Sequence, residues 1–347
     1  MTRQNARTLQ DAREHLRARR VVEALRHFEQ CDFDECAGDV WCCHMLSGDF
    51  ESAWRTSDEI ERRSPSRVWN GEWFNRKRVL IRCVHGLGDT IQLIRYAREL
   101  KRAGAVEVTA QMHPELTELI STAPGLDAAI TWGPRPEFDI EIEITELAWT
   151  FRTCASNVPA EVPYLDAPPG RIAQRAQRFA NSTGMRVGLI WTSSQWDTTR
   201  SIPLAMVGQA LRDIPDVTYF SVQHGPGHVQ AAQCDWVRYE GEQSSDILDT
   251  AADLMNIDLL IAVDTMAAHL AGALARPVWL LLKHDADWRW MLGRCDSPWY
   301  PTMRLFRQPR PGDWETPLGA MARRLEAVSP DRCPAASSRT PDLLWLF

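Results

Sequence analysis

The sequence predicts an α/β fold in which two Rossmann-like domains face each other across a cleft, preceded by a small all-helical segment. Two series of short apolar runs alternate with helical segments, and a linker rich in proline and small residues, 159–170, separates the two series. Short apolar runs between helices are typical of buried parallel strands. Because ligands bind beyond the carboxyl ends of such strands, we expect the functional site in the cleft.

The chain divides into four parts on this pattern. Residues 1–66 are predicted to be helical, 67–166 to form the N-terminal Rossmann-like domain, 167–330 the C-terminal one, and 331–347 a tail. The expected strands are 78–84, 106–112, 129–132, 139–144, 187–191, 218–223, 257–263, 277–282 and 304–306. The expected helices between and after them include 90–102, 114–123, 266–274 and 314–328.

The helical part carries a weak internal repeat. Ala24 is followed by a second copy at Ala53, and Gly48, Phe50 and Pro65 stand around it at the offsets of the latter half of a tetratricopeptide repeat. A plain helical hairpin that caps the neighbouring domain explains the same residues equally well. Two short repeats are in either case too few for a peptide-binding superhelix.

The composition narrows the classes of partner. The formal net charge is −7 at pH 7, which argues against a general nucleic-acid-binding surface. Only Lys77, Lys101 and Lys283 are lysines, so that the other 36 of the 39 basic residues are arginines and a phosphate would be held by guanidinium groups. The N-terminal region has no apolar segment and no run approaches the length of a membrane span, so we expect a cytoplasmic protein.

Nine cysteines are scattered along the chain without a regular framework. Cys31, Cys36, Cys42, Cys43 and His44 are close in sequence, which raises the question of a metal site. Their spacing lacks a paired C-x-x-C pattern, and they fall on expected helices. Reduced thiols are therefore the favoured interpretation, and we expect no bound metal.

A diphosphate site is predicted where strand 257–263 ends. Asp264 and Thr265 follow this strand, and a helix of small residues begins at Met266. The unpaired N–H groups and the positive dipole end of such a helix suit a phosphate. An ordinary packing turn between strand and helix is the alternative.

A second candidate site follows the first strand, at Gly86, Gly88 and Asp89. The spacing resembles a dinucleotide-binding fingerprint, but the third glycine would fall at Ile91, which disfavours a dehydrogenase. Asp89 is expected at the start of a helix that points into the cleft. It is interpreted either as an N-cap or as a general base acting on an acceptor hydroxyl.

Polar loops follow two strands of the second series. The loop Thr192 to Arg200 brings hydroxyls and a guanidinium to a strand end, and Arg200 is the residue expected to neutralise a diphosphate, unless it is an ordinary exposed loop arginine. His224 and His228 are interpreted as surface histidines of a turn rather than as metal ligands. The tract Asp287–Trp290 combines aromatic and basic residues, which fits a base- or sugar-stacking surface and a packing cluster equally well.

Five segments in order carry a family resemblance: Trp69–Glu72, HGLGDTIQLIRYA from His85, RSIPL at 200–204, VDTMAAHLAGALARPVWLLL from Val263, and Asp287–Gln308. Together they resemble the tetratricopeptide-repeat-linked glycosyltransferases related to the bacterial heptosyltransferases. The resemblance runs from the helical part to about residue 328. The chain departs from related sequences at Val84-His85, where those often carry Glu-Gln, which puts the acceptor contacts in question.

The resemblance implies a GT-B fold and an inverting glycosyltransferase that needs neither metal nor cofactor and takes a nucleotide-diphosphate sugar as donor. It implies that 67–166 binds the acceptor and 167–330 the donor, with Asp89 as the general base. The donor set implied is Thr192, Arg200, Gln223, Asp264, Thr265, Met266, Ala267, Ala268, His269 and Lys283. The acceptor set implied is His85, Gly88 and Gln92.

Other functions stay open at this stage. One is a non-catalytic nucleotide-sugar-binding or scaffold protein, and another is a nucleotide-sugar epimerase or hydrolase on the same fold. The acceptor is open among saccharides, peptides and small natural products. A weak membrane-surface or protein partner is also open, and the apolar end 343–347 fits either docking onto the first domain or a homo-oligomer contact.

Overall fold

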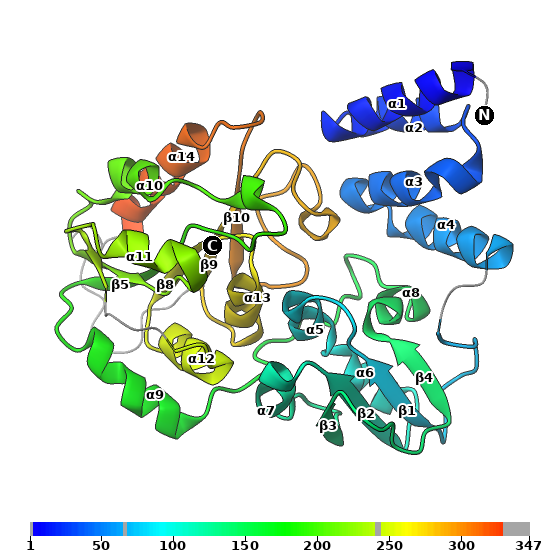
Figure 1. The fold of residues 1–347 in the computed structure, drawn as a ribbon, viewed down its shortest axis with the longest axis horizontal. Helices are drawn as coiled ribbons and strands as arrows, with labels where there is room; N and C mark the ends of the chain where they lie inside the picture. The colour runs from blue at the N-terminus through cyan, green and yellow to red at the C-terminus, as the bar shows by residue number, and fades with distance from the viewer. Residues whose placement is uncertain (1–2, 65–67, 240–243, 329–347) are drawn as a thin grey trace.

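The computed structural model describes residues 3–64, 68–239 and 244–328, and it has the expected α/β architecture with two parallel sheets (Figure 1). The first sheet has four strands in the order β3-β2-β1-β4, and the second has six in the order β10-β9-β8-β5-β6-β7. All strand pairs of both sheets are parallel. The predictions for Pro65 and for the tail 331–347 lie outside the described residues.

The four-stranded sheet follows the sequence pattern closely. Its strands are β1 (Arg78–Arg82), β2 (Glu107–Met112), β3 (Ala128–Thr131) and β4 (Ile140–Glu143), and its helices are α5 (Leu87–Leu93), α6 (Tyr96–Arg102), α7 (Thr117–Ile120) and α8 (Leu147–Thr150). The single helix expected over 90–102 is wrong: α5 and α6 are separate, and α5 begins at Leu87. The helix expected over 114–123 is shortened to α7, which a 3₁₀ turn at Pro114–Leu116 precedes.

The six-stranded sheet contains one strand that the sequence pattern did not predict, the two-residue edge strand β7. Its strands are β5 (Met185–Ile190), β6 (Val217–Ser221), β7 (Val237–Arg238), β8 (Leu259–Val263), β9 (Val278–Leu282) and β10 (Met303–Arg307). Its helices are α9 (Pro169–Arg175), α10 (Leu204–Leu211), α11 (His228–Ala231), α12 (Ile247–Met255), α13 (Met266–Ala273) and α14 (Glu315–Val328).

Both faces of the six-stranded sheet are buried. On β8, Leu259, Ile261 and Val263 belong to one core, while Leu260 and Ala262 belong to another, as the two-residue period of a strand requires. Helices α10 and α14 contribute to the first core, and α12 and α13 to the second. The second core continues into the four-stranded sheet, so the two sheets share one apolar interior.

The chain begins with four helices, α1 (Arg3–Arg17), α2 (Val21–Phe28), α3 (Phe33–Ser47) and α4 (Phe50–Arg63). Consecutive helices of this segment pack against each other, and Figure 1 shows them as a separate stack beside both sheets. A helical N-terminal segment is therefore confirmed, whereas its likeness to tetratricopeptide repeats stays a prediction. The cysteine-rich stretch lies in and just before α3; within the described residues, no group of three or more His, Cys, Asp or Glu side chains is placed to hold a metal ion.

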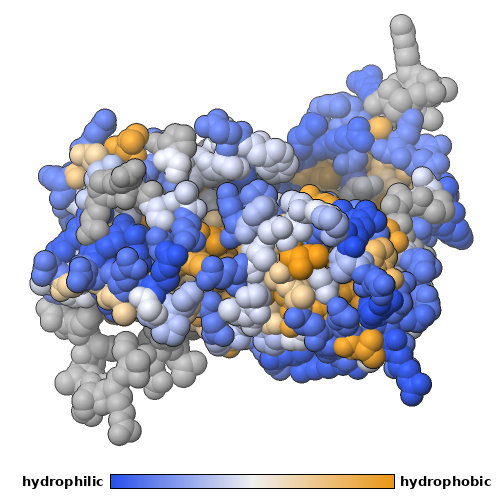
Figure 2. All heavy atoms as spheres, turned by 60° about the horizontal axis from the view of Figure 1, so that its bottom comes forward, coloured by the Kyte–Doolittle hydropathy of each residue, from blue (hydrophilic) through white to orange (hydrophobic). Residues whose placement is uncertain are grey.

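The face of the molecule in Figure 2 is mostly hydrophilic, with apolar residues in patches between the polar ones. In the part of the chain that the structure describes, none of the helices combines the length and the apolar character needed to cross a lipid bilayer. Trp196 stands out among the large apolar side chains because it is 88% exposed. It lies in the loop after β5, at the cavity described next.

Candidate functional site

A cavity of about 910 Å³ opens where the carboxyl ends of strands from both sheets meet. Residues after β1, β5, β6, β8 and β9 line it, which is the edge that the strand–helix connections predict. Eleven of the residues implied by the resemblance lie on its wall: His85, Gly88, Asp89, Thr192, Arg200, Gln223, Asp264, Thr265, Met266, Ala267 and His269.

Asp89 reaches the cavity from the first turn of α5. Gly86, in an extended conformation, is the N-cap of this helix, and its N–H donates to Asp89 Oδ2 at 3.0 Å. Asp89 is therefore not the N-cap that one interpretation of the sequence expected. It is the third helical residue, and its carboxylate folds back onto the cap as in a capping box.

The second oxygen of Asp89 accepts a hydrogen bond from Arg289, which belongs to the other half of the molecule. The Arg289 guanidinium also donates to Gln92 Oε1 at 2.6 Å and to Asp287 Oδ1 at 2.9 Å. One largely buried arginine thus joins a carboxylate of α5 to the loop after β9. Asp287 and Arg289 both line the cavity.

Asp264 is held on the opposite wall, directly after β8. Its carboxylate is buried and accepts a hydrogen bond from Trp290 Nε1 at 3.0 Å. Burial raises the pKa of this carboxyl, and the nearby Asp287 raises it further, whereas the bond from Trp290 acts in the opposite direction. The tract Asp287–Trp290 therefore supplies charge and hydrogen bonds to both walls, a role that neither sequence interpretation gave it.

The amino end of α13 faces the same space. Thr265 is the N-cap residue, its hydroxyl is buried, and it makes no hydrogen bond within the described residues. The N–H groups at the start of a helix lack carbonyl partners one turn earlier, and the helix dipole places positive potential there. In α13 the N–H of Ala268 donates to the carbonyl of Thr265 at 3.1 Å, so the groups that face an anion are the N–H groups of Met266 and Ala267. This arrangement offers N–H donors and one unused hydroxyl to an anion.

Arg200 supplies a guanidinium beside this helix end. Its Nη1 donates to the backbone carbonyl of Asp264 at 3.0 Å, and the group lies 5.8 Å from the ring centre of Trp196. Lys283 does not line the cavity. Its Nζ pairs with Asp197 Oδ2 at 2.9 Å and contacts Thr199 Oγ1 at 3.1 Å, so it anchors the loop that carries Arg200.

Three further predicted residues, Gln223, Gln92 and Ala268, contribute to the structure around the cavity. Gln223 lines the cavity, but its amide is used by the backbone: Oε1 accepts from the N–H groups of Trp191 and Thr192, at 3.0 and 2.8 Å. Its Nε2 donates to the carbonyl oxygens of Thr192 and His224, at 3.3 and 2.7 Å. Gln92 and Ala268 are buried off the cavity wall, and Gln92 acts as the acceptor for Arg289.

The interpretation of His224 and His228 as surface residues is wrong. His224 is partly buried, lines the cavity and pairs with Thr250 Oγ1 at 2.9 Å. His228 is buried, with its ring centre 4.3 Å from that of Tyr239. The 3₁₀ turn Gly225–Gly227 connects the two histidines, and their burial comes from tertiary contacts that local spacing does not reveal.

The chain is similar in sequence to a curated protein and similar in fold to solved glycosyltransferases. No family model matches the sequence. The chain is 25% identical over 305 residues to Protein FlbA of Caulobacter vibrioides, covering 78% of this chain and 50% of that protein, so it spans about half the length of this curated relative. A glycosyl transferase of family 9 from Veillonella parvula superposes with a TM-score of 0.53 at 13% identity, over 68% of this chain and 87% of that one.

The ADP-heptose LPS heptosyltransferase II of E. coli superposes with a TM-score of 0.52 at 12% identity, over 72% of this chain and 98% of that one. The fold is that of the family 9 glycosyltransferases. Shared fold at this level of identity concerns the architecture alone, so the chemistry has to be argued from the site. In this fold the cavity brings a carboxylate, Asp89, and the amino end of α13 at Thr265 to the same space.

Proposed function

We propose that this protein is an inverting, metal-independent glycosyltransferase that moves a sugar from a nucleotide-diphosphate donor to an acceptor nucleophile. One observation carries the proposal: Asp89 from one half and the amino end of α13 from the other line a single cavity. A carboxylate suits the removal of a proton, and a helix end with a nearby arginine suits a diphosphate. The shared fold with family 9 glycosyltransferases supports the same conclusion.

In the proposed reaction, the residues on each side of the cavity have a different role. Asp89 takes the proton of the acceptor as its nucleophilic atom bonds to the anomeric carbon from the face opposite the diphosphate. The bond between that carbon and the phosphate oxygen breaks, and the nucleoside diphosphate leaves with the electron pair. Arg200 and the first-turn N–H groups of α13 stabilise the charge that develops on the leaving group.

Donor binding is tested first, by thermal shift with a panel of nucleotide sugars and free nucleoside diphosphates, with and without EDTA. A donor at 100 times its dissociation constant stabilises the protein by about 2.7 kcal/mol. Turnover is then assayed with saccharide, peptide and small-molecule acceptors. Donor binding without turnover would favour a scaffold protein, and donor consumption without acceptor would favour a hydrolase or an epimerase.

The variant Asp89→Asn tests the general base. Its amide oxygen can still accept the N–H of Gly86, so the helix cap is retained while the proton acceptor is lost. We expect turnover to fall by about 10²–10⁴-fold with donor affinity little changed. The control is Asp213→Asn at an exposed carboxylate outside the cavity, and equal turnover in the two variants would remove Asp89 from the mechanism.

A further inference from the structure

The helical segment α1–α4 is attached to the half of the molecule that carries Asp89. Trp54 on α4 donates from Nε1 to the carbonyl of Thr153 at 2.6 Å. Asp58, one turn further along α4, accepts from Trp149 Nε1 at 2.9 Å and from Arg152 Nη2 at 2.7 Å. These bonds join α4 to α8 and the residues that follow it.

The same segment is attached to the loop that follows β9 in the other half. Arg19, after the end of α1, donates to the carbonyl oxygens of His284 and Ala286, at 3.3 and 2.5 Å. The N–H of Leu292 donates to the carbonyl of Leu46, at the end of α3, at 2.7 Å. Figure 1 shows chain between β9 and β10 reaching across toward α3, and α3 packs against the 3₁₀ turn Trp288–Trp290.

Aromatic packing fixes the middle of this loop, residues 284–292. The ring of Trp41 on α3 meets that of Trp288 edge-on, with centres 5.2 Å apart, and Trp288 meets Trp299 in the same way at 6.2 Å. Trp288 and Leu292 also pack against the apolar core of the helical segment. The next residue after Trp288 is Arg289, the arginine that contacts Asp89.

We propose that α1–α4 is an internal bracket of the active site: it holds loop 284–292 so that Arg289 reaches across the cavity to fix Asp89. Arg19 and Trp41 are then positioning residues that act through Arg289. The inference rests on the proposed function for its catalytic consequence, and on the contacts above for its structural part. It gives the helical segment a partner within its own chain.

The physical reason is the geometry that a general base requires. The Asp89 carboxylate has one oxygen on the Gly86 N–H and the other on Arg289, so its orientation depends on where the loop places the guanidinium. Misplacement of a reacting group by about 1 Å can lower a rate by about 10²-fold. Loosening the loop should therefore lower kcat, while the donor contacts of α13 and Arg200 are retained.

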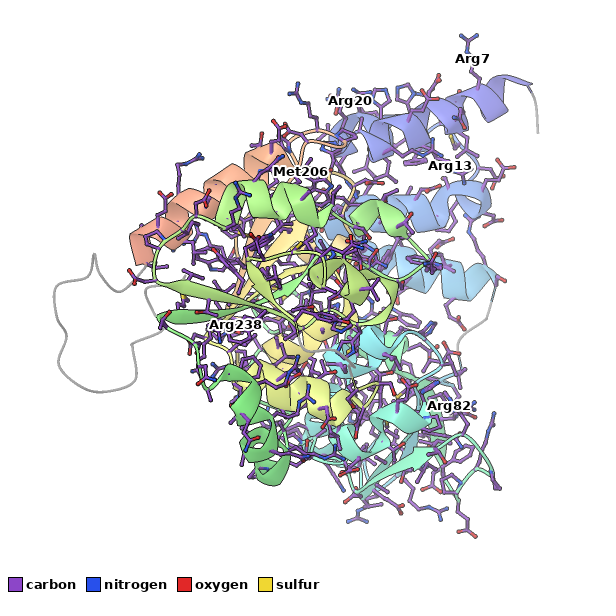
Figure 3. All side chains as sticks on the ribbon, turned by 60° about the vertical axis from the view of Figure 1, so that its left-hand side comes forward. Arg7, Arg13, Arg20, Arg82, Met206 and Arg238 are labelled. Carbon is purple, nitrogen blue, oxygen red and sulfur yellow. The ribbon has the colours of Figure 1, made fainter. Side chains whose placement is uncertain are left out.

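The test combines hydrogen exchange with kinetics on the full chain. Arg19 has a left-handed backbone, φ 59°, which asparagine tolerates, so Arg19→Asn removes the two loop bonds without adding strain. Trp41→Leu removes the edge-on contact with Trp288. The control is Arg13→Gln, which breaks the Arg13–Asp39 pair inside the segment, away from the loop; Figure 3 labels Arg13 on these helices.

For Arg19→Asn and Trp41→Leu we expect amide exchange in 284–292 to become at least tenfold faster, with exchange in both sheets unchanged. We expect kcat to fall at least tenfold and donor KM to change less than threefold, and Arg13→Gln to behave as wild type. Unchanged loop exchange, or a loosened loop with unchanged kcat, would overturn the bracket.

Should Arg19→Asn lose its fold, Trp41→Phe, which keeps an aromatic contact, must show a smaller effect than Trp41→Leu. Absence of turnover in the wild type would remove the proposed function, and the exchange data would still decide whether the segment holds the loop.

Discussion

His269 forms part of the cavity wall as a neutral side chain. It is buried, stacked on Trp290 with ring centres 5.4 Å apart, and its Nδ1 pairs with Tyr300 Oη at 3.0 Å. Burial lowers its pKa to about 3, and the positive charges of Arg289, Arg95 and Arg200 act in the same direction. At neutral pH His269 therefore offers a hydrogen bond or a flat surface to a ligand, and no charge.

The lowered pKa has a consequence for stability. The unfolded chain takes up a proton at His269 near pH 6.5, whereas the folded protein resists it until about pH 3, so this group destabilises the fold as the pH falls through that window. We expect the wild type to lose about 2 kcal/mol of unfolding free energy between pH 7 and 5 through this residue. Urea unfolding at both pH values should show a smaller loss in His269→Gln than in wild type or in the exposed control His113→Gln; parallel losses in all three would contradict it.

At the level of elements, a close contact at the cavity lies between α5 and α13. Gly88, in the first turn of α5, lies against the first turn of α13: a Cβ at this position would come within 3.0 Å of His269 Cδ2 and 3.6 Å of Met266 Cα. The glycine therefore sets how closely the two helix ends approach. This distance also sets how far Asp89 stands from the diphosphate site that we propose.

A larger side chain at Gly88 should force the two helices apart. We expect Gly88→Val to lower the unfolding free energy by about 1–3 kcal/mol, as overpacking of a close contact does. Gly38 is the matched control, because it is also helical, in α3, and a Cβ added there would meet none of the described atoms within 4 Å. Since valine has a better helix propensity than glycine, Gly38→Val should be neutral or slightly stabilising, and equal stabilities of the two variants would show that the contact is loose.

How much of this could be predicted from the sequence varies with the range of the interaction. Strands β1, β2, β5 and β8 follow from local apolar runs, and the start of α13 at Met266 follows from the residue pattern around it. The ends of strands also predicted the wall formed by residues 264–267. By contrast, α5 begins three residues earlier than expected, because Gly86 rather than Asp89 caps it.

The contacts that complete the site are long-range and have no local signal. Arg289 and Asp89 are 200 positions apart, and Arg19 and Ala286 are 267 apart. Aromatic and basic residues alternate in the tract that contains Arg289, but nothing in its spacing indicates a carboxylate partner. Lys283 was predicted to contact the donor, whereas in the structure it pairs with Asp197 and anchors the loop that carries Arg200.

On the scale of the whole molecule, Arg95 joins the two sheet halves through a buried guanidinium. It donates to the carbonyl of Gln92 at 2.8 Å, to those of Pro159 and Trp299 at 3.1 and 2.6 Å, and to Tyr164 Oη at 2.8 Å. The rings of Tyr164 and Tyr300 lie close to it, with centres 4.3 and 4.8 Å from the guanidinium carbon. One side chain thereby satisfies backbone groups from the first half, the linker and the second half.

Arginine is suited to this position because its planar fork can donate in several directions at once, whereas a lysine ammonium is a compact point charge. In Arg95→Lys several of these buried acceptors lose their donor, so we expect the unfolding free energy to fall by about 3 kcal/mol, the scale of hydrogen bonds to a charged group. Arg98→Lys on α6, the helix that Arg95 precedes as its N-cap, is the control, because the Arg98 side chain is 38% exposed and pairs with the exposed Glu161; it should change stability by less than about 0.5 kcal/mol. Urea unfolding followed by tryptophan fluorescence and by circular dichroism measures both quantities. If Arg95 couples the halves, the unfolding transitions followed by fluorescence and by circular dichroism, which coincide in a two-state protein, should separate in Arg95→Lys. A single transition at the wild-type midpoint would show that the shared apolar core alone holds the halves together.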